Sequence, residues 1–100
     1  MKRIGDIIRE LREKKGFLLR EVAAEIAIDQ ALLSKIERNE RMPTKDQVIR
    51  LAEFYDIEEA QFLIALLSDK LAYEVQDEEY GLEALKVAEK KVKYRKSQPK

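Results

Sequence analysis

The chain contains no cysteine, no histidine and no tryptophan, and its 100 residues include only three glycines and two prolines. The absence of cysteine excludes a disulfide framework and a thiolate site, and the absence of histidine removes the commonest general base and metal ligand. Three glycines leave no glycine-rich loop to hold phosphate groups. The sequence therefore argues against an enzyme and predicts no catalytic residues, no metal site and no cofactor.

Long apolar runs are also missing. No stretch reaches the roughly 18 uncharged apolar residues that a membrane-spanning helix requires. The N-terminal segment MKRIGDIIRELREKKG is charged and amphipathic, and it has no apolar centre of signal-peptide length. We therefore expect a cytoplasmic protein with no membrane partner.

The 20 basic and 20 acidic residues balance, but they are separated along the chain. Residues 1–52 carry a formal charge of +3, residues 53–85 carry −9 and residues 86–100 carry +6. This distribution suits a protein that meets phosphates with one face only. The basic end of the chain either touches nucleic acid or is the solvated end of a helix, where the helix dipole favours basic residues.

Apolar residues recur at helical spacing through most of the chain, and no segment alternates as a strand would, so we expect an all-α fold. Thr44 and Gln47 form a capping box, and Asp56 and Glu59 repeat it. The expected helices span about residues 3–15, which Gly16 ends, then 18–27, 30–38, a segment starting near residue 45, a leucine-rich segment ending at residue 75, and 78–94.

The segment LLREVAAEIAIDQALLSKIERNERMP, residues 18–43, predicts two short helices joined by a tight corner. Asp29 stands where an N-cap belongs, and Asn39 is the expected left-handed residue that ends the second helix before Pro43. The second helix leaves polar side chains outward, which have the chemistry to contact base edges and phosphates.

Over about residues 4–57 the chain resembles the Cro/CI-type (XRE-like) helix-turn-helix family of transcriptional regulators. The residues that carry the resemblance are Leu11, Arg12, Gly16, Glu21, Val22, Ala23, Ile26, Ile28, the run LSKIE at 33–37, Arg41, Pro43, Leu51 and Ala52. It implies a five-helix DNA-binding domain whose second motif helix enters the major groove of double-stranded DNA.

The resemblance also assigns roles to individual residues. It implies a buried ion pair between Arg12 and Glu37, for which two solvated charges are the alternative. The expected base contacts are Gln30, Ala31, Ser34 and Lys35, and the expected phosphate contacts are Arg20, Arg38, Asn39 and Arg41.

Two departures from the family pattern fall in the first motif helix and the corner. Leu18 and Leu19 replace the usual Ser or Thr and Gln that cap the helix and hold a phosphate, so Arg20 is expected to supply that contact. Ala27 replaces the customary turn glycine, which predicts a corner with negative φ.

The leucine-rich helix carries an apolar band that is too wide for one small domain to cover. We expect core contacts on one side and a homodimer contact through Ile64, Leu67 and Leu71 on another, with ordinary core as the alternative. The predicted organisation is a DNA-binding domain including the dimerisation helix (1–75), a C-terminal helical extension (76–96) and a disordered tail (97–100).

These observations favour a sequence-specific transcriptional regulator, a repressor or autoregulator, that binds a near-palindromic operator as a homodimer. The N-terminal matches are also similar, more weakly, to restriction–modification controllers and methyltransferase-associated regulators. One alternative is an antitoxin whose toxin binds the apolar surface after Phe62. Another is a helical adaptor that binds proteins through its C-terminal helices and does not contact DNA.

Overall fold

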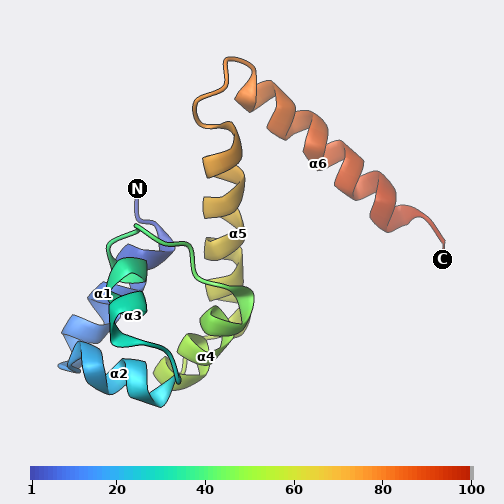
Figure 1. The fold of residues 1–100 in the computed structure, drawn as a ribbon. Coiled ribbons are helices and arrows are strands. Elements are labelled where there is room, and N and C mark those ends of the chain that lie inside the picture. The colour runs from blue at the N-terminus through green and yellow to red at the C-terminus, as the bar shows by residue number, and fades with distance from the viewer. Residues whose placement is uncertain (100) are drawn as a thin grey trace. The chain divides into compact units, whose positions relative to one another are not determined.

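The structure is a computed structural model that describes residues 1–99, within which the chain forms six α-helices and no strand (Figure 1). The helices are α1 (Ile4–Lys15), α2 (Leu19–Glu25), α3 (Gln30–Glu37), α4 (Lys45–Tyr55), α5 (Glu59–Val75) and α6 (Gly81–Ser97). The all-α prediction is confirmed. Ser97 still belongs to α6, whereas the sequence assigned it to a disordered tail; Lys100, the last residue of that tail, lies outside the described residues.

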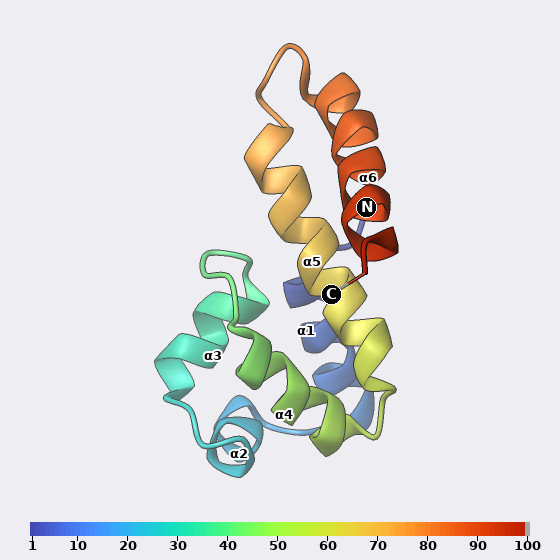
Figure 2. The same ribbon diagram turned by 90° about the vertical axis from the view of Figure 1, so that its right-hand side faces the viewer.

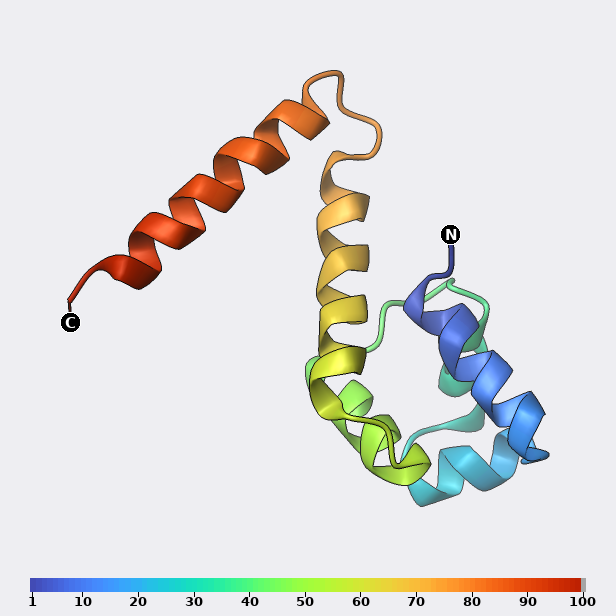
Figure 3. The ribbon, with the colours of Figure 1, turned by 180° about the vertical axis from the view of Figure 1, so that it is seen from behind.

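The chain divides into two compact units, Met1–Asp69 and the part that begins at Lys70. In the first unit, α1 to α4 and the first turns of α5 surround one apolar core (Figures 2 and 3). Helical spacing brings the apolar residues of each helix to its inner face. The buried apolar side chains are Ile4, Ile8, Val22, Ala23, Ile26, Leu33, Ile36, Val48, Leu51, Ala52, Tyr55, Phe62 and Leu66.

The first four helices all end in the same way, with one residue in the left-handed region. These residues are Gly16, Ala27, Asn39 and Asp56, with φ between 54° and 75°. In each case the next N–H donates to a carbonyl five residues earlier, which satisfies a carbonyl that the helix leaves free. The bonds are Phe17–Arg12 at 3.1 Å, Ile28–Ala23 at 3.0 Å, Glu40–Lys35 at 2.9 Å and Ile57–Ala52 at 2.9 Å.

Gly16 and Asn39 end their helices as the sequence predicted, but two other expectations were wrong. Ala27 has φ of 56°, not the negative value expected for alanine, because the corner between α2 and α3 keeps the geometry that suits glycine. Asp56 ends α4 in the left-handed region instead of starting α5, since Asp tolerates that conformation better than most residues.

The helix starts are capped unevenly. Thr44 and Gln47 form the predicted box, with Gln47 N donating to Thr44 Oγ1 at 3.1 Å and Thr44 N donating to Gln47 Oε1 at 3.0 Å. Asp29 occupies the N-cap position of α3 as expected, but its side chain accepts no capping hydrogen bond. The orphan amides at the start of α3 are therefore left to solvent or to a ligand.

In the second unit, from Lys70 to Pro99, the only buried residue is Gly81. A side chain at this position would overlap the backbone carbonyl of Val75. The apolar residues of α6 are mostly exposed, including Leu82, Val87 and Val92. Within residues 1–99, no helix combines the length and apolarity needed to cross a membrane.

The left-handed corner at Ala27 leads to the first prediction. The left-handed conformation costs a residue with a side chain roughly 1–2 kcal/mol, and a glycine at position 27 would remove this cost. Part of the stabilisation is lost again, because glycine gives the unfolded chain more conformational entropy. Ala27→Gly is therefore expected to raise the free energy of unfolding by about 0.5–1 kcal/mol. Urea unfolding followed by circular dichroism measures this.

The matched control is Ala24→Gly, an exposed position inside α2 with helical backbone. It should lower the free energy of unfolding by about 1 kcal/mol. Equal effects of the two substitutions would mean that the corner is not strained.

Candidate nucleic-acid interface

The face of α3 that points away from the core carries most of the residues predicted to contact bases. Gln30, Ala31 and Lys35 are exposed, and Ser34 is half-buried. Leu33, Ile36 and Glu37 occupy the opposite, buried face of the helix. The periodicity of the helix thus brings the four candidate base contacts onto one side, and Figure 2 shows α3 at the edge of the first unit.

A bidentate ion pair fixes the back of α3 to α1. Arg12 Nε donates to Glu37 Oε2 at 2.9 Å and to Oε1 at 3.1 Å, and its terminal nitrogen donates to Oε1 at 2.9 Å. The side chain of Glu37 is 3% exposed and that of Arg12 is 18% exposed. These hydrogen bonds are the main cause that raises the pKa of Arg12 above its usual value. The pair implied by the family resemblance is therefore present, with Glu37 buried and Arg12 half-buried.

Arg12 also supports the turn that leads into α2. Its other terminal nitrogen donates to the carbonyl of Phe17 at 3.1 Å. The Phe17 ring packs on Phe54 with centroids 5.1 Å apart, and Phe54 packs edge-on against Tyr55 at 4.9 Å. Burial, followed by the charge of Glu37, raises the pKa of Tyr55 to about 12, so the phenol stays neutral.

The start of α2 has lost the usual polar side-chain cap, as the sequence indicated. Leu18 is the N-cap residue, and the carboxylate of Glu21 accepts a hydrogen bond from Leu18 N at 2.7 Å. Of the two hydrogen bonds of a capping box, only the one from the N-cap backbone to the Glu21 carboxylate is therefore present, because leucine has no side-chain acceptor. Arg20, the expected replacement for the missing phosphate contact, is exposed in the first turn of the same helix. At the other end of α2, Arg50 donates to the carbonyl of Ile26 at 3.0 Å and closes the corner.

The side chain of Asn39 holds the start of α1. Its Oδ1 accepts from Gly5 N at 3.2 Å and its Nδ2 donates to Asp6 Oδ1 at 3.0 Å. The pKa of Asp6 is lowered, first by the hydrogen bond from the backbone of Arg3 and also by Asn39. The sequence predicted a phosphate contact for Asn39, and the structure adds two bonds that its carboxamide makes inside the protein. This contact spans 34 residues, so local spacing gave no signal for it.

Close packing makes the same junction depend on glycine. A side chain at Gly5 would overlap the backbone carbonyl of Ile36 and the side chain of Asn39. The start of α1 therefore lies directly against the end of α3. Sequence reasoning missed this glycine because it sits inside a helix, where glycine is otherwise unfavourable.

The loop after α3 carries the other two expected phosphate contacts. Arg38 and Arg41 are both exposed, and Arg38 Nε lies 2.6 Å from Glu40 Oε2. A phosphate would have to compete with this carboxylate for Arg38, an acidic neighbour that sequence reasoning did not single out. A surface pair of this kind is weak, so phosphate can displace it at small cost.

The residues expected to form the dimer contact lie on one exposed face of α5. Ile64, Leu67 and Leu71 are 66%, 56% and 54% exposed, whereas Phe62 and Leu66 are each 1% exposed. At 100° per residue the two sets point in roughly opposite directions. The helix thus has two apolar faces, of which only one is covered within the first unit.

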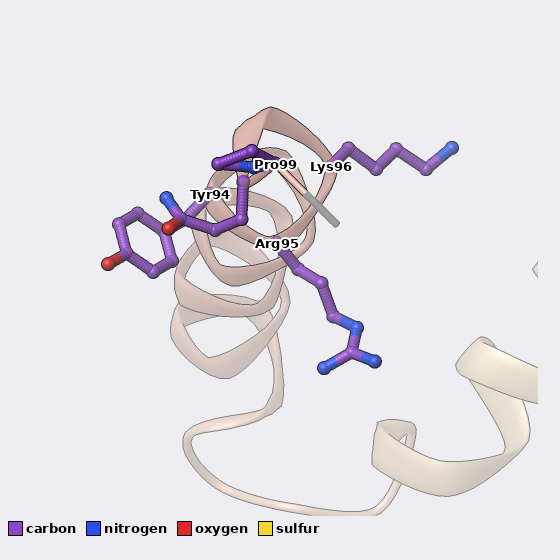
Figure 4. Close-up of a pocket in the computed structure, with 5 residues that line it drawn as sticks. Tyr94, Arg95, Lys96 and Pro99 are labelled. Carbon is purple, nitrogen blue, oxygen red and sulfur yellow. The ribbon is translucent and has the colours of Figure 1, made fainter.

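The basic end of α6 forms a shallow hollow lined by Tyr94, Arg95, Lys96, Gln98 and Pro99 (Figure 4). All five residues are exposed. Figure 4 shows that the side chains of Arg95 and Lys96 point in different directions, so they do not converge on one phosphate. This hollow is the end of a solvated helix.

Comparison with known proteins agrees with this geometry. Residues 8–62 match the helix-turn-helix family, and the chain therefore belongs to this family. It is 36% identical over 52 residues to a protein of Thermococcus kodakarensis that is provisionally named an HTH-type transcriptional regulatory protein. The match covers 52% of this chain but only 16% of that protein.

Two solved structures share the fold. A hypothetical protein from E. coli is 25% identical with a TM-score of 0.69, and the match covers 84% of this chain and 86% of that one. The complex of the SinR and SinI proteins contains a chain that is 24% identical with a TM-score of 0.56, and the match covers 95% of this chain and 99% of that one. At this identity the second likeness shows the fold alone.

The buried ion pair leads to the second prediction. Arg12→Met leaves the Glu37 carboxylate buried without its cation, which is expected to cost about 3 kcal/mol of unfolding free energy or somewhat more. Adding Glu37→Leu should recover much of this loss, since two apolar side chains can replace a buried pair. Urea unfolding of the wild type, both single variants and the double variant gives the coupling energy.

Strict additivity of the two single effects would mean that the residues do not interact. Arg9→Met serves as the control, because Arg9 lies on α1 with an exposed side chain and makes only weak surface pairs. Its effect should stay within about 0.5 kcal/mol.

Proposed function

We propose that the chain is a DNA-binding transcriptional regulator that reads its operator with α3. The observation that carries this proposal is the two-sided character of α3. One face is exposed and bears Gln30, Ala31 and Lys35, and the other is fixed to α1 through Glu37. A reading helix must be held rigidly while its outer side chains remain free. Membership of the helix-turn-helix family and the name of the archaeal relative support the same class.

In the proposed complex α3 enters the major groove and its side chains meet base edges. Gln30 can pair with N6 and N7 of one adenine, and Lys35 can reach O6 and N7 of guanine or a phosphate. Ser34 bonds either kind of base, and Ala31 suits contact with a thymine methyl group. These assignments rest on the hydrogen-bonding chemistry of each side chain and on the outward position of all four on α3.

The phosphate contacts in the proposal come from both sides of α3. Arg20 in the first turn of α2 and Arg38 and Arg41 in the loop after α3 are exposed cations. Asn39 is the fourth residue expected to contact phosphate. Its side chain bonds Gly5 and Asp6 at the start of α1, so in the proposal it also sets the position of the two arginines.

We further propose that the regulator is a homodimer and acts most simply as a repressor or autoregulator. A near-palindromic operator has half-sites about 34–36 Å apart, which a symmetric pair of reading helices can meet on one side of the DNA. The exposed face of α5 formed by Ile64, Leu67 and Leu71 supplies the apolar surface for such a dimer.

The same surface supports a second candidate, a protein partner bound through the C-terminal helices. Among the described residues from Lys70 onward, no apolar side chain is buried, and the similar SinR fold was solved together with SinI. An antitoxin that binds its toxin here, or an adaptor that does not contact DNA, would use this surface. Specific DNA binding separates the regulator and the antitoxin from the adaptor.

The third prediction tests the reading function. Repeated selection of random duplexes with the purified chain at about 0.15 M salt is expected to yield one two-fold symmetric site. The Gln30→Ala variant should lose about 1–3 kcal/mol at one base pair of each half-site and accept other bases there. Electrophoretic mobility shifts on the selected and singly changed duplexes measure both effects.

Gln61→Ala is a suitable control, because Gln61 is exposed on α5 and not on α3. The base preference of this variant should match that of the wild type at every base pair of the selected operator. If the wild-type chain binds the selected and scrambled duplexes equally at this salt concentration, the regulator proposal is wrong and the adaptor remains.

The fourth prediction concerns the dimer. Changing Leu67 and Leu71 together to Glu places charges on the exposed face of α5, so self-association should fail while the core of the first unit stays folded. The variant is expected to sediment as a monomer and to lose the gain of about 100-fold or more that two linked heads give on a full operator.

Changing Tyr73, another exposed residue of α5, to Glu is the comparison. It lies on the side of Leu66 and not on that of Leu67, so the dimer should persist. Sedimentation of the wild-type chain decides the matter, because a monomer at high micromolar concentration would rule out the proposed dimer.

A further inference from the structure

One carboxylate on α5 reaches the start of α1. Asp69 Oδ2 accepts a hydrogen bond from Ile4 N at 2.7 Å, across 65 residues of sequence. Ile4 is the first residue of α1, and its N–H is one of the amides that no carbonyl within the helix can satisfy. A carboxylate is a strong acceptor at this place, because the helix dipole favours negative charge.

Asp69 is also the last residue that ties α5 to the first unit. Phe62 and Leu66 on the inner face of α5 are buried, and Asp69 follows them on the same face. All five side chains from Lys70 to Glu74 are exposed. The first unit therefore holds α5 through two buried apolar side chains about one turn apart, the partly buried Leu63 and Ala65 beside them, and one hydrogen bond at the end.

The hydrogen bond of Asp69 lies beside the contact that joins α1 to the loop after α3. Ile4 N is bound by Asp69, and the next amide, Gly5 N, is bound by Asn39 from the loop after α3. Asp69 lines a small hollow together with Asn39 and Arg41. The amides at the start of α1 thus connect α5 with the loop that carries the proposed phosphate contacts.

We infer that Asp69 is a positioning residue that sets the half-site spacing of the operator. The inference rests on the proposed function. Asp69 fixes α5 on α1, and α5 carries the proposed dimer face, so the hydrogen bond governs how the two copies of α3 are separated and rotated. One added base pair moves a half-site by about 3.4 Å and turns it by about 35°, so a rigid dimer discriminates against it. Without this bond, α5 pivots on Phe62 and Leu66, and the two copies of α3 in the dimer adapt to several half-site spacings.

The test uses the full chain and the operator selected by the wild type. Duplexes are prepared with the half-sites moved apart or together by one and two base pairs, along with a duplex that has a single half-site. The wild type is expected to lose about tenfold or more in affinity for each base pair of change, and Asp69→Ala about threefold or less. Binding to the single half-site should be equal for both.

Two further variants complete the design. Asp69→Asn keeps an acceptor oxygen, so it is expected to fold and to show a spacing preference between those of the wild type and Asp69→Ala. Asp77→Ala removes the same charge from an exposed residue that follows α5, and it should behave as wild type. Thermal unfolding of each variant checks that the first unit is intact.

The outcomes separate this inference from the proposed function. If Asp69→Ala or Asp69→Asn weakens every duplex by one common factor, or if both keep the wild-type spacing preference, Asp69 has only a structural role and the inference is wrong. If the wild type selects no operator at all, the proposed function fails first and the inference fails with it.

Discussion

The junction between α1 and α3 is the constraint on which the rest of the first unit depends. Near the end of α1, Arg12 donates three hydrogen bonds to the buried Glu37. Near the start of α1, Gly5 lets the backbone lie directly against Ile36. Charge pairing and close packing therefore hold two separate points of α1 against the last turn of α3. A shift of α3 along α1 would leave a carboxylate buried without its cation, which is a cost of several kcal/mol.

Such a constraint is needed because α3 is short. It has eight residues, and an isolated helix of that length does not persist in water. Its order comes from Leu33, Ile36 and Glu37 on the inner face, so the outer face has no structural task. This separation leaves the outer side chains free for the proposed DNA contacts, while the inner ones keep the helix in place.

Much of the fold could be predicted from sequence because its signals are local. Apolar spacing located the helices, and Gly16, Asn39 and the box at Thr44 marked the helix ends where the structure has them. The predictions failed where geometry came from the tertiary fold. Ala27 takes a left-handed conformation because the corner requires it, and Asp56 does the same at the end of α4.

The candidate site shows the same division. The outward residues of α3 follow from helical periodicity alone, and family resemblance supplied the pairing of Arg12 with Glu37. Nothing in the local pattern indicated that Asn39 would bind the start of α1, or that Asp69 would bind the amide before it. Contacts over 34 and 65 residues depend on how helices pack, and a single sequence does not encode that packing in any short spacing.

The two faces of α5 also explain why a small domain can carry a long apolar helix. Phe62 and Leu66 complete the core, and the covered face needs no more than these and a few partly buried neighbours. The opposite face adds nothing to the folding of the first unit, and its exposed leucines would favour aggregation if they had no partner. An apolar stripe that is costly to leave in water and unnecessary for the fold supports the proposal that this face is a surface for association. Because α5 is bound to α1 next to the loop after α3, whatever covers that stripe would be mechanically connected to α3, the proposed reading helix.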